Sequence, residues 1–129
     1  MLNTMSEPPV AAVWPRPARR RNNLTAALRH IETRFTERLT LDELAAIAGL
    51  SVFRFATVFR RHHGTSPYRY LSATRVRAAQ DLLRRGVPPA IAAIEVGFCD
   101  QSHLCRHFRA VCGMTPGQFM AAIATNGDV

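Results

Sequence analysis

The sequence contains no lysine: all 17 residues that carry a full positive charge at neutral pH are arginines. Long apolar runs are missing too: residues 90–96, for example, include Glu95 and are far fewer than the ~20 residues of a membrane-spanning helix. The three cysteines are an odd number, which does not suit a disulfide framework. Residues 1–22 hold four prolines and an arginine run but no apolar segment typical of a secretory signal. We therefore expect a cytoplasmic protein without membrane association.

Catalytic and metal-binding signatures are also missing. The motifs GxSxG, HExxH, GxxxxGKS and GxxxxGKT do not occur, and no two acidic residues would face each other on a helix. His103 and His107 lie four residues apart near Cys99 and Cys105, which raises a zinc hypothesis. On a helix, however, Cys105 points away from His107, and no carboxylate is placed to support a ligand. The sequence thus predicts no enzyme activity, no metal and no cofactor.

What the sequence does contain is an excess of positive charge. Its 129 residues, 47% of them apolar, are enough for one compact domain or two very small lobes. The formal charge of +8 indicates a polyanionic partner, and with a membrane disfavoured that partner is nucleic acid. Counted by segment, residues 1–22 carry +3, residues 23–87 carry +6 and residues 88–129 carry −1. We therefore expect the first part of the folded chain to supply most of the attraction to phosphates.

Helix signals follow one another along the chain, and no segment shows the alternation of a β-strand. Thr40-Leu-Asp-Glu43 is a capping box, while Gly64 and Gly113 stand where helices should end. We predict an all-α fold of seven helices, at about residues 24–36, 41–48, 52–63, 67–85, 89–97, 101–112 and 116–124. The folded domain then spans residues 23–124, between a disordered tail rich in proline and arginine (1–22) and a short C-terminal tail (125–129).

The predicted helices form an internal repeat. Phe59-Arg60 stands five residues before Gly64, and Phe108-Arg109 stands five residues before Gly113, at an offset of 49 residues. The same offset relates Ser66, Pro67 and Tyr70 to Thr115, Pro116 and Phe119. Each copy is a short helix, a turn with glycine and a longer helix, which is the helix-turn-helix form. We place the two copies at about residues 41–63 and 89–112, as two lobes joined by a long central helix at about 67–85.

The second helix of each copy should turn one face to the core and the other to solvent. By helical spacing, the inward residues are Phe55, Val58, Phe59 and His62 in the first copy and Leu104, Phe108 and Val111 in the second. The candidates for DNA contact in the first copy are Phe53, Arg54, Ala56, Thr57, Arg60 and Arg61. Those in the second copy are Gln101, Ser102, His103, Cys105, Arg106 and Arg109.

The charged and amide side chains in these sets suggest two ways of meeting DNA. Arg60 and Arg61 suit phosphate oxygens, although a solvated helix end is the other interpretation. Gln101 and Arg106 have the bidentate geometry for the edges of adenine and guanine, respectively. The first copy is thus expected to grip the backbone, and the second to discriminate between bases.

The remaining candidates are apolar or titrate near neutral pH. Ala56 and the methyl group of Thr57 suit contacts with thymine methyl groups. Phe53 has two interpretations, either such a contact or packing against a neighbouring helix. His103 and His107 are expected to approach phosphates, in which case affinity rises below about pH 6.5.

The central helix sets the distance between the two copies. Its 19 residues give a rod of about 28 Å, comparable to the ~34 Å between successive major grooves on one face of DNA. One chain can then read two grooves, and because its two outward faces differ, we expect an asymmetric DNA site. The run Arg19-Arg-Arg21 is interpreted either as part of a solvated tail or as an arm that enters a minor groove.

Over about residues 27–123, these motifs resemble the AraC/XylS family of bacterial transcription regulators. The first half supplies Leu41-Asp-Glu-Leu-Ala45, Gly49-Leu-Ser51, Phe59-Arg-Arg61, Gly64-Thr-Ser-Pro67 and Arg75-Val-Arg-Ala-Ala79. The second half supplies Ile94-Glu-Val-Gly-Phe98, Ser102-His-Leu-Cys-Arg-His-Phe-Arg109 and Gly113-Met-Thr-Pro116. The chain departs from the family at Gln118-Phe-Met120, where an aromatic residue followed by arginine is common. It also departs at Ala56 and Thr57, which are smaller than the usual base-reading residues, so base reading there rests on Arg54 and apolar contacts.

The resemblance implies a seven-helix DNA-binding domain with two recognition helices in adjacent major grooves. It also implies contact with RNA polymerase and, most often, activation of transcription. Because only 22 residues precede the domain, the chain resembles the stand-alone members that bind DNA as monomers. Two alternatives stay open: a protein-interaction module that titrates another regulator or RNA polymerase, and the DNA-binding half of a larger sensor.

Overall fold

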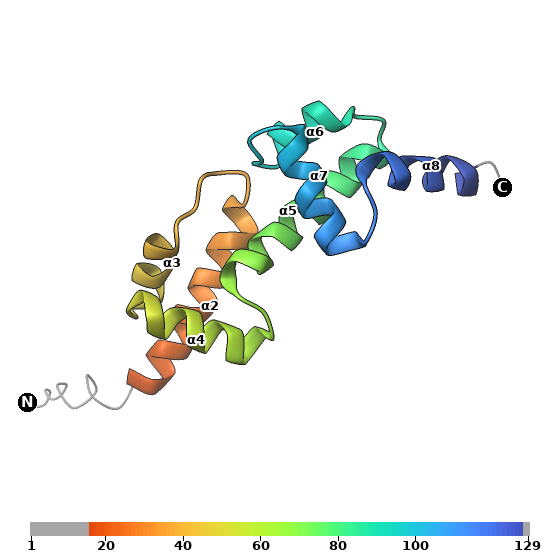
Figure 1. The fold of residues 1–129 in the computed structure, drawn as a ribbon. Coiled ribbons are helices and arrows are strands. Elements are labelled where there is room, and N and C mark those ends of the chain that lie inside the picture. The colour runs from red at the N-terminus through yellow and green to blue at the C-terminus, as the bar shows by residue number, and fades with distance from the viewer. Residues whose placement is uncertain (1–15, 128–129) are drawn as a thin grey trace, which may run out of the picture.

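The computed structural model describes residues 16–127, and over this range the chain forms seven helices and no strand (Figure 1). In chain order they are α2 (Arg16–Arg34), α3 (Leu41–Ala48), α4 (Val52–His63), α5 (Pro67–Arg84), α6 (Pro89–Glu95), α7 (Gln101–Cys112) and α8 (Pro116–Gly127). The prediction of an all-α fold is confirmed. None of the helices in the described range combines the length and the apolar character needed to cross a membrane.

The two ends of the described chain differ from the prediction. α2 begins at Arg16, inside the segment that the sequence predicts as a disordered tail through residue 22. Alanine and arginine are good helix formers, and proline is tolerated in a first helical turn, so this stretch can extend the helix. It has no apolar periodicity from which a helix could have been predicted. α8 likewise continues to Gly127, beyond the predicted end at residue 124. Residues 1–15 and 128–129 of the predicted tails, and the side chains of Arg19-Arg-Arg21, lie outside the described residues.

The helix boundaries follow from local hydrogen bonds. The Thr40 hydroxyl accepts from the Glu43 N–H at 3.1 Å, and the Glu43 carboxylate accepts from the Thr40 N–H at 3.0 Å, which completes the capping box of α3. Ser51 caps α4 and Asp100 caps α7 in the same manner, each through its side-chain oxygen. These caps place both second helices where the sequence predicts them.

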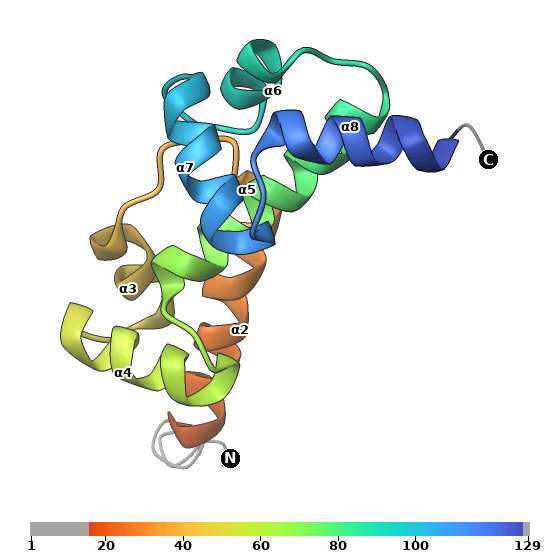
Figure 2. The ribbon, with the colours of Figure 1, turned by 45° about the vertical axis from the view of Figure 1, so that its right-hand side comes forward.

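The described chain has two hydrophobic cores rather than one. The first takes its buried residues from α2, α3, α4 and α5: Leu24, Ala27, Ile31, Leu44, Ala45, Ala48, Phe55, Phe59 and Leu71. The second takes them from α5, α6, α7 and the turn between α6 and α7: Val76, Ala79, Leu83, Ala92, Ala93, Val96, Phe98, Leu104 and Phe108. Figures 1 and 2 show the outcome, two lobes with α5 passing from one into the other.

The 49-residue repeat is present in the packing as well as in the sequence. The rings of Phe59 and Tyr70 meet edge to face with centroids 5.7 Å apart and an angle of 72° between them. At the same offset, the rings of Phe108 and Phe119 meet at 5.4 Å and 69°. The start of α5 therefore closes the first lobe as α8 closes the second, while the rest of α5 belongs to the second core.

Candidate nucleic-acid interface

The candidate residues of α4 lie on the solvent side of the helix. Phe55 and Phe59 are fully buried, which directs the opposite face of α4 outward. Four side chains on that face are exposed, namely Arg54, Thr57, Arg60 and Arg61, and Ala56 is half-buried. Phe53 is 79% exposed, so it does not pack against a neighbouring helix, and the packing interpretation of this residue is wrong.

The candidate residues of α7 are arranged in the same way. Leu104 and Phe108 are fully buried, and the exposed side chains are Gln101, Ser102, Arg106 and Arg109. His103 and Cys105 are half-buried at the edge of this face. Figure 2 shows α4 and α7 one above the other on the left-hand side of the molecule. In both helices, most of the candidate side chains are therefore exposed to solvent.

Two residues that the sequence assigns to the core lie outside it. His62 is exposed, and the neighbouring His63 packs on Phe59 with ring centroids 4.5 Å apart. Val111 is 43% exposed, whereas the neighbouring Cys112 is half-buried. In both helices the last inward position is eight residues after the first, not seven. In both cases the residue at this position meets α5: His63 lies beside the Tyr70 ring, and Cys112 accepts a hydrogen bond from Gln80.

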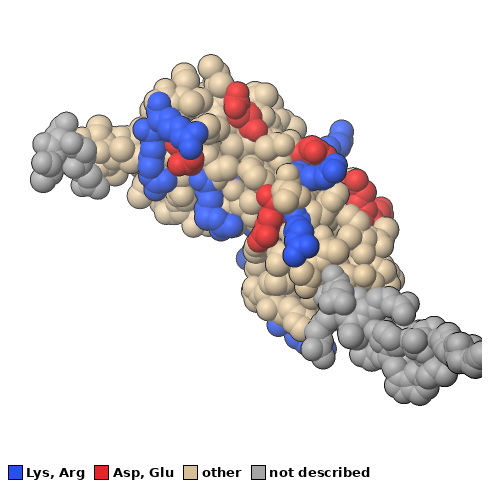
Figure 3. All heavy atoms as spheres, turned by 180° about the vertical axis from the view of Figure 1, so that it is seen from behind, with Lys and Arg blue, Asp and Glu red and all other residues tan. Residues whose placement is uncertain are grey.

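The arginines of this surface have no carboxylate partner among the described residues. The ion pairs found within residues 16–127 join Arg34 to Glu37 at 3.7 Å and Arg85 to Asp81 at 2.8 Å. Neither pair involves the arginines exposed on α4 and α7: Arg54, Arg60, Arg61, Arg106 and Arg109. Figure 3 shows arginine and acidic side chains interspersed on the face opposite to that of Figure 1. The guanidinium groups of α4 and α7 are therefore available to an external anion.

The two histidines of α7 are engaged within the protein. Their rings pack on Phe98, each with a centroid distance of 5.1 Å. His103 Nδ1 accepts a hydrogen bond from the Cys99 N–H at 3.2 Å, and His107 Nε2 lies 3.4 Å from the Tyr68 hydroxyl. Burial, helped by the positive neighbours, lowers the pKa of His107 below its ordinary value. Both side chains thus brace the first turns of α7. No three His, Cys, Asp or Glu residues in the described part of the chain gather as metal ligands.

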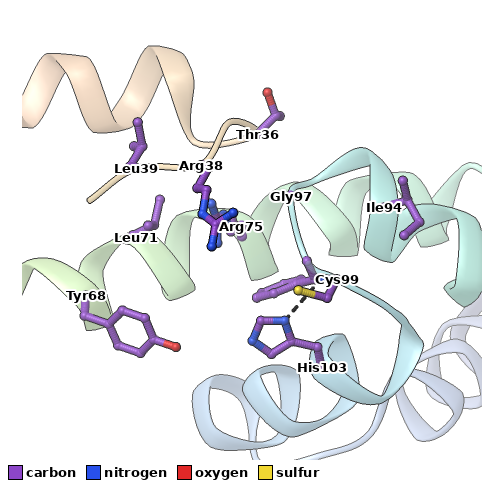
Figure 4. A pocket seen from close by; sticks show the side chains of 11 residues that line it. Thr36, Arg38, Leu39, Tyr68, Leu71, Arg75, Ile94, Gly97, Cys99 and His103 are labelled. Atoms are coloured by element: carbon purple, nitrogen blue, oxygen red, sulfur yellow. Dashed lines mark hydrogen bonds between the residues drawn. The ribbon is translucent and has the colours of Figure 1, made fainter. Parts of the chain in front are cut away.

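A cavity of about 460 Å³ opens between the two lobes (Figure 4). Arg38 lines it from the loop between α2 and α3, Tyr68 and Arg75 from α5, and Gly97 and His103 from the turn before α7 and its first turns. The sequence predicts no role for Arg38, Tyr68 or Arg75. The available signal was the turn of the second copy, from Gly97 to Asp100, which is one residue longer than the turn of the first copy, from Gly49 to Ser51.

Known proteins are similar to this chain in sequence. Residues 44–122 match the family model of a helix-turn-helix domain. The chain is similar to the uncharacterized HTH-type transcriptional regulator YbfI of Bacillus subtilis (strain 168), with 36% identity over 74 residues that cover 57% of this chain and 27% of that protein. It is also similar to the RCS-specific HTH-type transcriptional activator RclR of Escherichia coli (strain K12), with 36% identity over 81 residues that cover 62% of this chain and 28% of that protein. The chain therefore spans less than a third of the length of these curated relatives.

A solved structure extends the likeness to three dimensions. The DNA-binding domain of AdpA, a global transcriptional factor whose crystal structure contains a target DNA, aligns with a TM-score of 0.75 and 28% sequence identity. The alignment covers 81% of this chain and 95% of that one. Both helix-turn-helix lobes therefore lie within the shared fold.

Proposed function

The chain belongs to the AraC/XylS family of transcription regulators, and we propose that it binds specific sites in double-stranded DNA with α4 and α7 in adjacent major grooves. The observation that carries the proposal is the presence, in one chain, of two second helices that each carry exposed arginines without an ion-pair partner among the described residues. The likeness to a DNA-binding domain that was crystallised with its target supports it.

The side chains divide the work of recognition between the two helices. Arg60 and Arg61 hold phosphate oxygens, which positions α4 without selecting a sequence. Gln101 and Arg106, both exposed at the start and middle of α7, read base edges through paired hydrogen bonds. Phe53, with most of its ring in solvent, contacts thymine methyl groups from α4.

We further propose that one molecule occupies the whole site and that it activates transcription through contact with RNA polymerase. Both recognition helices belong to one chain, so the two grooves can be filled without a second copy. The relative RclR is named a transcriptional activator, which supports the direction of regulation. Sedimentation of the complex should give one chain per duplex, and two chains per duplex would contradict the monomeric mode.

The decisive experiment is selection from a random pool of DNA with the purified chain. We expect an asymmetric site in two parts whose centres are about 10 base pairs apart, and an affinity that falls steeply as salt rises. Enrichment of no sequence would contradict the proposal and would support the alternative of a module that titrates another protein. Enrichment of a palindrome would contradict recognition by one chain.

A further inference from the structure

The first lobe is attached to α5 by few side chains. Only Leu71 of α5 is buried in the first core, whereas Val76, Ala79 and Leu83 are buried in the second. Near the start of α5, the Tyr70 hydroxyl donates a hydrogen bond to the Glu32 carboxylate of α2 at 2.5 Å. Most of α5 is therefore part of the second lobe, and the orientation of the first lobe depends on a small number of contacts.

Arg75 supplies a large share of these contacts from the middle of α5. Its Nε donates to the Phe35 carbonyl at 2.6 Å, and its NH2 group donates to the Glu37 carbonyl at 2.8 Å. Both carbonyls lie just beyond the C-terminal end of α2, where backbone oxygens lack helical partners and where a positive charge is favoured. The guanidinium group thus caps the C-terminal end of α2, one of the helices of the first lobe.

The same guanidinium group touches the second lobe. Its central carbon lies 5.7 Å from the centre of the Phe98 ring, in cation–π geometry. Gly97 passes so close that a Cβ at this position would lie 2.9 Å from Arg75 Nε and 2.9 Å from the Phe35 oxygen. Gly97 also has a φ of 102°, a backbone angle that residues other than glycine rarely adopt. The backbone of the second lobe, the side chain of α5 and the backbone of the first lobe therefore meet at one point.

We propose that Arg75 is a positioning residue that sets the orientation of α4 relative to α7, and thereby the spacing between the two parts of the DNA site. The inference rests on the proposed function. Arginine suits the task because its planar group donates to two carbonyls while its face lies on a ring. Arg75 is half-buried, and the apolar side chains that fill the two cores do not include it, so its loss should loosen the relation between the lobes more than the lobes themselves.

The test measures binding to duplexes that carry the selected site with its two parts moved by −1, 0, +1 and +2 base pairs. One added base pair shifts one part by about 3.4 Å and turns it by about 34°. The wild-type protein should lose about 10-fold in affinity with the first shift, and Arg75→Gln should lose less than about 3-fold. Each ratio compares two duplexes with the same preparation, so a partly unfolded fraction does not alter it.

Two further variants complete the design. Arg77→Gln removes the same charge from an exposed position of the same helix, and it should keep the wild-type ratios. Arg75→Lys keeps the charge but cannot hold both carbonyls, so its ratios should lie between those of the wild type and Arg75→Gln. It also serves as the test if Arg75→Gln does not fold.

The outcomes separate the two proposals. Spacing ratios that are equal in the wild type and both Arg75 variants would overturn the positioning role while the proposed function stands. Wild-type protein that binds all duplexes equally would overturn two-groove recognition, and the positioning role with it. Loss of spacing preference in Arg77→Gln as well as in Arg75→Gln would also overturn the inference, because charge alone would then explain the effect.

Discussion

The two lobes are copies of one arrangement, but their surfaces and supports differ. Residues 23–87, which include the first lobe and α5, carry +6, whereas residues 88–129 carry −1. α4 ends in Arg60 and Arg61, while α7 presents Gln101 and Arg106 from its first half. Under the proposed function, the first copy of the repeat binds the DNA backbone and the second copy reads the base edges.

The lobes also differ in the aromatic contacts that support their recognition helices. In the first lobe, His63 and Tyr70 pack on Phe59 near the C-terminal end of α4. The second lobe has the equivalent contact between Phe108 and Phe119, and in addition Phe98 packs on His103 and His107 of α7. The part of α7 near Gln101 and Arg106 therefore has an aromatic support in addition to the contact that the two lobes share. Side chains that read the edges of DNA bases need a rigid supporting helix, whereas side chains that bind phosphates tolerate a more mobile one.

The largest expected effect comes from removing the equivalent core rings. Phe59→Ala and Phe108→Ala should each lower the free energy of unfolding by about 3–5 kcal/mol, since both rings are fully buried. Denaturant unfolding followed by circular dichroism measures the change. Phe53→Ala, at an exposed position of α4, is the control and should stay within about 0.5 kcal/mol of the wild type. Unequal losses in the two core variants would show that the lobes differ in more than their surfaces.

Removal of the proposed base-reading arginine should reduce specificity. Arg106→Ala is expected to cost about 1–3 kcal/mol with the preferred site and to relax the choice of base at one position. Affinities for the selected site, for single-base variants and for random duplex provide the measurement. An equal loss on specific and random DNA would remove Arg106 from the reading role.

Removal of the two proposed phosphate contacts should have the opposite pattern. The double variant Arg60→Ala with Arg61→Ala should weaken binding to all sequences alike and reduce the slope of log affinity against log salt by about 2. Titrations at several salt concentrations test this, with Arg106→Ala as the comparison. If the double variant changed the preferred sequence, the division of work between the lobes would be wrong.

A smaller effect concerns pH and the second lobe. Because burial lowers the pKa of His107 in the folded state, the unfolded chain binds the proton more readily. Stability should therefore be complete above about pH 6.5 and fall as the pH decreases below that value. The urea midpoint at pH 8 and at pH 5.5 measures the decrease, which should be smaller in His107→Phe than in the wild type. The lowered pKa also argues against a rise in DNA affinity near pH 6.5 carried by His107.

The last and smallest expected effect is a difference in reactivity between the cysteine thiols, all of which belong to the second lobe. Cys99 is exposed, whereas Cys112 is half-buried and accepts a hydrogen bond from Gln80 at 2.9 Å. Burial raises the pKa of the Cys112 thiol, so less thiolate is present at neutral pH. Alkylation followed by mass spectrometry should modify Cys99 well before Cys112. Equal rates would mean that the second lobe opens on the timescale of the labelling.

The sequence was sufficient for the helices and the repeat, since their signals act over short distances. The capping box at Thr40 and Glu43 and the glycines at 64 and 113 mark helix ends through bonds within a few residues. It was insufficient for the final turn of each second helix, where His63 and Cys112 took the inward places expected for His62 and Val111. The covering helix decides that choice, and helical periodicity within one segment does not contain it.

The same limit explains the bridge between the lobes. Sequence placed Arg75 in a helix, and the 49-residue offset placed the candidate DNA-contacting residues on matching outward faces. That its guanidinium group caps α2, with partners 40 and 38 residues away, follows only when both cores have packed against α5. Hydrogen bonds along a helix join residues four apart and can be read from spacing. A side chain that joins two lobes depends on how their surfaces fit, and that fit emerges from packing of the whole chain.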